Sequence, residues 1–81
     1  MQVKVRAFAG LREALGFTEA TLELAPGAQV DDVLARLGAE HPAAGLAERH
    51  FSLAVNRAFA RGDQLLNDGD ELALIPPVSG G

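Results

Sequence analysis

The chain has 81 residues, 48% of them hydrophobic and 22% charged, which is the size and composition of one small globular domain. It contains no cysteine, which excludes a disulfide framework, a thiolate metal site and a cysteine nucleophile. The formal net charge of −4 and the short apolar runs argue against nucleic acid and membranes as partners, and they favour a soluble cytoplasmic protein.

Two alternating segments open the chain. Residues 2–8 and 18–24 each alternate apolar and polar side chains, the period of a strand with one buried face. Between them, residues 11–15 have room for only a short helical turn before a glycine. Phe8 falls in phase with the polar side chains of the first segment, so we expect it on the outer face of the sheet.

One long amphipathic helix is predicted over residues 30–41. Its apolar side chains recur with the spacing of a single helical face, at Val30, Val33, Leu34 and Leu37. His41 precedes Pro42, which disfavours the helical conformation and ends the helix. The following residues, 43–50, have no clear period, and we interpret them as a loop with some helical character.

Three more strands complete the pattern, at residues 51–55, 58–60 and 71–75. Asn56 and Arg57 form a tight turn between the first two, and Pro76 and Pro77 end the last one. The simplest arrangement is an α+β fold of the ubiquitin-like β-grasp type, with a mixed sheet of about five strands packed on one main helix. We expect the first and last strands side by side and parallel at the centre of the sheet.

This order of elements predicts two parts. Residues 1–75 form the β-grasp domain, and residues 76–81 form a flexible C-terminal tail.

The chain has no recognisable active site of its own. His41 and His50 are too few and too far apart for a metal site, so we predict none. Neither serine lies in a nucleophile elbow, and there is no glycine-rich phosphate loop.

A group of apolar side chains falls on the polar side of its strands. Ile75 is out of phase with Leu72 and Leu74, and if the first and last strands are neighbours it can meet Phe8 on the solvent side. Phe59 extends this patch. Isolated exposed hydrophobic residues are common, but a clustered patch indicates a protein interface.

The negative charge is concentrated near the C-terminus. Residues 63–81 contain Asp63, Asp68, Asp70 and Glu71 and no basic residue. Such asymmetry predicts steering toward a basic partner surface. The alternative is that residues 67–70 simply form a turn, which these residue types favour.

The chain ends in Gly80-Gly81 after two prolines. One interpretation is an ordinary frayed terminus. The other is a tail that threads a narrow channel and presents its terminal carboxylate to another enzyme, because side chains at these positions would block the passage.

At this point the sequence resembles a known family, the small subunits of molybdopterin synthase, which are ubiquitin-like sulfur carriers. The resemblance extends over the full length and is most specific at residues 68–81; residues 8–16, which include Arg12, and residues 54–57 also match.

The resemblance implies that Gly81 is the reactive residue and that Gly80 allows its passage into a partner. An E1-like enzyme would use ATP and magnesium to adenylate Gly81, and a sulfur donor would convert the adenylate to a thiocarboxylate. The sulfur would pass to cyclic pyranopterin monophosphate on the large subunit of a heterotetramer. This chain would then be a non-catalytic, sulfur-donating subunit that binds no cofactor of its own, and the active site would lie on the large subunit. We expect its partner contacts at Phe8, Arg12, Phe59, Asp68, Asp70, Glu71, Ile75, Pro76, Pro77 and Val78.

Other functions stay open. Sulfur carriers of thiamine synthesis or tRNA thiolation and protein-conjugating modifiers use the same activation chemistry. A pure binding module is a further alternative.

Overall fold

One mixed sheet carries the fold. The computed structural model describes residues 1–77, whose five strands are β1 (Gln2–Ala7), β2 (Glu19–Glu23), β3 (Ser52–Val55), β4 (Ala58–Ala60) and β5 (Glu71–Ile75). Its helices are α1 (Ala9–Leu15), α2 (Val30–Glu40) and two single-turn 3₁₀ helices, η1 (Pro42–Ala44) and η2 (Leu46–Glu48).

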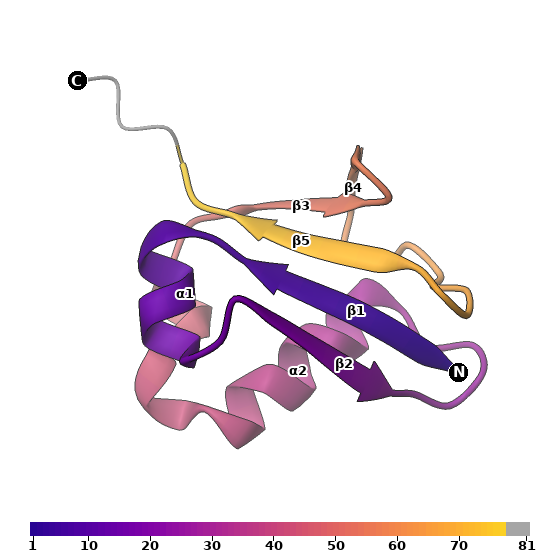
Figure 1. Ribbon diagram of the computed structural model, residues 1–81, viewed down its shortest axis with the longest axis horizontal. Coiled ribbons are helices and arrows are strands. Elements are labelled where there is room, and N and C mark those ends of the chain that lie inside the picture. The colour runs from indigo at the N-terminus through magenta and orange to yellow at the C-terminus, as the bar shows by residue number, and fades with distance from the viewer. Residues whose placement is uncertain (78–81) are drawn as a thin grey trace.

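The strands lie in the order β2-β1-β5-β3-β4 (Figure 1). β1 and β5 are parallel, with Val5 opposite Leu72, and the other pairs are antiparallel. The predicted central pairing of the first and last strands is therefore confirmed, and so is the α+β, β-grasp arrangement.

The core lies between the sheet and α2, which crosses one face of it (Figure 1). Side chains from both layers are almost completely buried there: Val3, Val5, Val30, Val33, Leu37, Leu72 and Leu74. Asp31 and Asp32 lie in the first turn of α2, where their negative charges complement the helix dipole. Asp32 also accepts a hydrogen bond from the backbone N of Gln29 at 2.7 Å. Every helix within residues 1–77 is too short or too polar to cross a membrane.

Helical structure is more extensive than the sequence predicts. α1 has seven residues instead of a short turn over residues 11–15: it begins at Ala9, and its apolar side chains Leu11 and Leu15, one turn apart, are both buried. Gly16 ends α1 in the left-handed conformation, at φ 81°. The segment 43–50, expected as a loop, contains η2 and most of η1.

Leu34 differs from the other predicted core positions of α2. It is only half-buried, and it lies beside a hollow that it shares with Leu46 and Phe51. Helix spacing alone could not distinguish it from Leu37, because the burial of Leu34 depends on how η2 packs beside α2.

The predicted tail begins directly after β5. Pro76 is half-buried and Pro77 is exposed. Residues 78–81 lie outside the described residues, so the predictions made for Val78, Gly80 and Gly81 stay predictions.

The difference between the two leucines of α2 can be measured. Leu37→Ala should lower the free energy of unfolding by about 2–5 kcal/mol, because Leu37 is 1% exposed and its removal leaves a cavity. Leu34→Ala, the same change three residues away, should cost clearly less, since water already reaches that side chain. Chemical denaturation of the two variants tests this, and equal losses would contradict the described packing of α2.

Candidate functional site

The face of the sheet that points away from α2 contains a shallow hollow. The strand register places Arg6, Ala73, Ala54 and Phe59 in one row across β1, β5, β3 and β4. The two alanines form a low floor in the middle of this row, and larger side chains surround it. The hollow has a volume of about 400 Å³ and is lined by Arg6, Phe8, Ala54, Arg57, Phe59, Glu71, Ala73 and Ile75.

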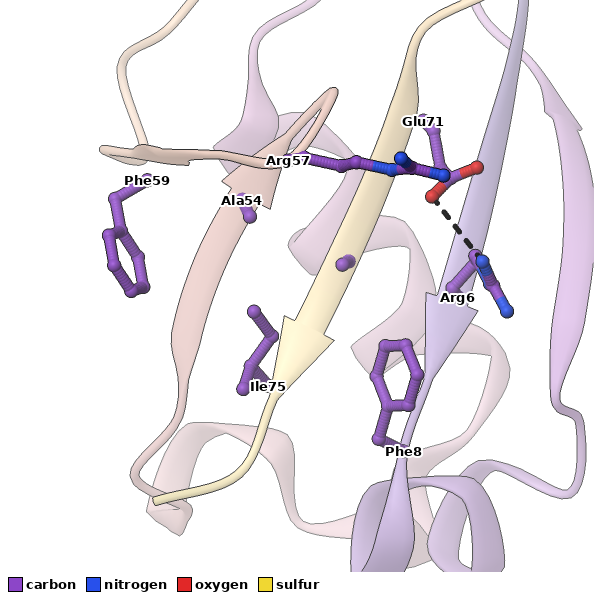
Figure 2. A pocket seen from close by; sticks show the side chains of 8 residues that line it. Arg6, Phe8, Ala54, Arg57, Phe59, Glu71 and Ile75 are labelled. Carbon is purple, nitrogen blue, oxygen red and sulfur yellow. Dashed lines mark ion pairs between the residues drawn. The ribbon is translucent and has the colours of Figure 1, made fainter. Parts of the chain in front are cut away.

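We call these eight lining residues the docking face. One end of the docking face is apolar. Phe8 has extended backbone angles (φ −125°, ψ 151°), so it continues the alternation of β1 and lies on the same face as Arg6. Figure 2 shows Ile75 between Phe8 and Phe59, which are 39% and 83% exposed. The structure thus brings together the three apolar residues of the predicted patch, while their role in partner binding stays a prediction.

The other end of the docking face is charged. Arg6 Nη1 lies 3.6 Å from Glu71 Oε1, and the Arg6 guanidinium carbon lies 5.5 Å from the centroid of the Phe8 ring. Arg57 extends from its hairpin toward Glu71 (Figure 2). Because these side chains are partly exposed, their interactions contribute little to stability and remain available to a partner.

The β3–β4 turn positions Arg57. Asn56 and Arg57 both have positive φ angles, 50° and 71°, as the favoured two-residue hairpin turn requires. The backbone N of Asn56 donates to the carbonyl of Glu71 at 2.8 Å, and Asn56 Oδ1 accepts from the backbone N of Glu71 at 3.0 Å. These two bonds fix the turn to the start of β5 and hold Arg57 at the edge of the hollow.

The predicted acidic residues have partners within the fold. Asp70 is 8% exposed, and its carboxylate accepts hydrogen bonds from Asn56 Nδ2 at 2.9 Å and from the backbone N of Asn67 at 2.7 Å. Asp68 accepts from the backbone N of Gln2 at 2.7 Å. Both precede β5, at the opposite end of that strand from Pro76 (Figure 1). The structure gives them a role in the turn, and their steering of a partner stays a prediction.

The remaining predicted contacts lie outside the hollow. Arg12 is exposed on α1, and Pro76 and Pro77 follow the last residue of β5. Sequence reasoning missed four lining residues: Arg6, Ala54, Arg57 and Ala73. The alternation of β1 and β5 could have identified Arg6 and Ala73, because each lies in phase with a residue of the predicted patch. Arg57 could not be found this way, since it lies in a turn.

The lining of the docking face, as far as the structure describes it, contains apolar and charged side chains. Within residues 1–77 there is no group of three or more His, Cys, Asp or Glu side chains placed to hold a metal ion. The lining residues include no hydroxyl, thiol or imidazole group. What the face offers is apolar area bordered by charges, the composition of a protein interface.

The role of Asp70 in the turn leads to a stability prediction. Asp70→Ala should lower the free energy of unfolding by about 1–3 kcal/mol, because it leaves Asn56 Nδ2 and the backbone N of Asn67 without an acceptor. Asp63→Ala is the matched control: its side chain is 72% exposed and pairs only with exposed Arg61, so the loss should be negligible. Thermal unfolding of the two variants would contradict this role if they were equally stable.

Comparison with known proteins identifies the family. The ThiS family profile matches residues 5–81. The chain is 45% identical to the molybdopterin synthase sulfur carrier subunit of Chlamydomonas reinhardtii, over the whole of both chains.

Two solved structures extend the comparison. The fold is similar to SAMP1, the small archaeal modifier protein 1 of Haloferax volcanii, with a TM-score of 0.87 and 31% identity over the whole of both chains. It is also similar to a chain in the complex of subunits 1 and 2 of the molybdopterin-converting factor of Helicobacter pylori, with a TM-score of 0.69 and 26% identity over the whole of both chains. The chain therefore belongs to the ThiS family.

Proposed function

We propose that this chain is the sulfur-carrying small subunit of a molybdopterin synthase. The observation that carries the proposal is the match, over its whole length, to a relative with that name at 45% identity. The position of β5 supports it, because this central strand contributes Ile75 to the docking face and leads directly to Pro76 and the last residues of the chain. A partner bound on the docking face would therefore lie next to the first residue of the tail, Pro76.

The chemistry takes place at the carboxylate of Gly81. A carboxylate is ionised near neutral pH and is a poor electrophile, so it must first be activated. An E1-like enzyme that uses ATP and magnesium would join the carboxylate to AMP and release pyrophosphate. A sulfur donor would then attack the acyl carbon, displace AMP and leave a thiocarboxylate on Gly81. The large subunit would bind cyclic pyranopterin monophosphate and catalyse the transfer of sulfur to it.

The two glycines before the terminal carboxylate suit this chemistry. They have no side chains, so they can enter a narrow channel that leads to an active site on the partner. Ordering each backbone residue costs about 1–2 kcal/mol, which binding of the folded domain must offset. Docking face and tail would thus act together.

The docking face would serve both partners in turn. The large subunit and the activating enzyme each need access to the C-terminus of this chain. The C-terminal tail follows β5, and β5 contributes to the docking face, so both partners would bind at the same place. Their complexes with this chain would then exclude each other. In the H. pylori complex named above, a similar chain is paired with a second subunit, which supports a large-subunit partner here.

A second candidate function is protein modification. The similarity to SAMP1, named a small archaeal modifier protein, favours it. A protein-conjugating modifier would use the same activation step and then join its terminal carboxyl to a protein amine. Sulfur carriage for thiamine synthesis or tRNA thiolation shares the activation step. The acceptor distinguishes these functions: a pterin, a thiazole precursor, a tRNA base or a protein amine.

The proposal is tested most directly at the terminus. Deleting Gly81 should leave folding and docking nearly unchanged but abolish adenylate formation and sulfur delivery, because the carboxylate no longer reaches the reacting centre. Adding one alanine after Gly81 should have the same effect, because the new terminal carboxylate would lie beyond the reacting centre. Purified synthase supplied with the pterin precursor provides the assay, and near wild-type product formation by the deleted chain would refute the proposal.

Docking is tested at Phe8. Phe8→Ser should weaken binding to the purified large subunit by about tenfold or more, as expected for an exposed aromatic residue that a partner buries, with little change in stability. Leu65→Ser is the control, because Leu65 is also a large exposed hydrophobic residue, at 59%, but lies outside the hollow. A loss of stability that matches the loss of affinity would place Phe8 in the core instead.

A further inference from the structure

The charged end of the docking face has an excess of positive charge. Two guanidiniums, Arg6 and Arg57, lie at its rim with the single carboxylate of Glu71. Lys4, on the same face of β1, is 3.9 Å from Glu19 and is therefore already paired. Among residues 1–77, Arg57 makes no ion pair. This local charge is opposite in sign to the net charge of −4 on the chain.

We propose that the docking face recognises a carboxylate side chain of its protein partner, bound between Arg6 and Arg57 at the edge of the alanine floor. The inference rests on the proposed function, because it describes how the same face selects the large subunit. On this inference, the partner has an Asp or Glu side chain close to those of its own apolar residues that contact Phe8 and Ile75.

An unsatisfied donor supports this assignment. Arg6 Nε is buried and, among the buried side-chain nitrogen and oxygen atoms of residues 1–77, it is the one without a hydrogen-bond partner. A buried donor without an acceptor raises the free energy of the unbound chain. The side chain is held over Phe8 by the cation–π contact and near Glu71 by a 3.6 Å ion pair, which is too long for a hydrogen bond. A small rotation of Arg6 would present Nε and a terminal nitrogen together to an incoming acceptor.

The geometry of guanidinium favours a carboxylate as that acceptor. Its planar set of donors matches the two oxygens of a carboxylate, and the paired bonds are about twice as strong as neutral hydrogen bonds. A phosphate would also match, but the remaining lining is apolar: Phe8, Ala54, Phe59, Ala73 and Ile75. That composition fits a folded protein surface, which buries the pair and strengthens it by excluding water.

Glu71 competes with the partner in this arrangement. In the unbound chain it is the carboxylate nearest Arg6, so it neutralises part of the charge that the partner would recognise. Removing the charge of Glu71 should therefore tighten binding. If Glu71 instead steers the chain toward a basic partner, as its acidic character predicts from sequence, the same substitution should weaken binding. The sign of the effect distinguishes the two roles.

The experiment measures the affinity of full-length variants for the purified large subunit by calorimetry. Arg57→Gln should weaken binding by about tenfold, and Glu71→Gln should tighten it by about threefold. Arg61→Gln is the matched control, since it removes the same charge from a side chain that is 89% exposed and outside the hollow, and it should change affinity less than twofold. Denaturation of each variant verifies that folding is intact.

The outcomes separate this inference from the proposed function. If Phe8→Ser weakens binding but Arg57→Gln does not, or if Glu71→Gln weakens it, carboxylate recognition is refuted and the docking of the large subunit stands. If the wild-type chain does not bind the large subunit, both are refuted. An affinity that falls with added salt for the wild type, and falls less for Arg57→Gln, supports the inference.

Discussion

The parallel pairing of β1 with β5 is the constraint on which the rest of the structure depends. It joins the first and last strands of the chain at the centre of the sheet, so the core against α2 and the docking face on the other side both need this pair. On the inner face it brings Val5 beside Leu72; on the outer face it brings Arg6 beside Ala73. Because β5 is the last strand, whatever binds the outer face also lies next to the point where the tail begins.

The outer face of the sheet changes from apolar to charged along the hollow, and this arrangement follows from the strand register. Alanines at Ala54 and Ala73 leave room above the central strands, with apolar side chains at one end of the hollow and two arginines near the other. The acidic turn is at the far end of β5, where Asp70 fastens the β3–β4 hairpin to the loop before β5. A single polar side chain, Asn56, connects these regions by bonding to both Asp70 and Glu71. The turn is therefore part of what shapes the docking face.

Sequence periodicity was sufficient for most of the fold because β1, β2 and β5 each alternate between buried and more exposed side chains. It located all five strands, the main helix and the parallel central pair, and it placed Phe8 and Ile75 on the outer side. Periodicity failed where the burial of a residue depends on neighbouring segments. Leu34 has the spacing of a core residue but lies at the edge of the core and is only half-buried. Asp70 is acidic but buried, and its carboxylate accepts hydrogen bonds from two separate loops, at Asn56 and Asn67. Arg57 could not be predicted either, since its direction depends on a turn with two positive φ angles.

The central claim is that this chain carries sulfur on its C-terminal carboxyl group. The most direct measurement is the intact mass of the wild-type chain after incubation with purified activating enzyme, ATP, magnesium and a sulfur donor. We expect a species heavier by the difference between one sulfur and one oxygen atom, with the change located at Gly81 by fragmentation and absent when ATP is omitted. A chain whose mass is unchanged under conditions in which the enzyme thiolates a known carrier would contradict the claim.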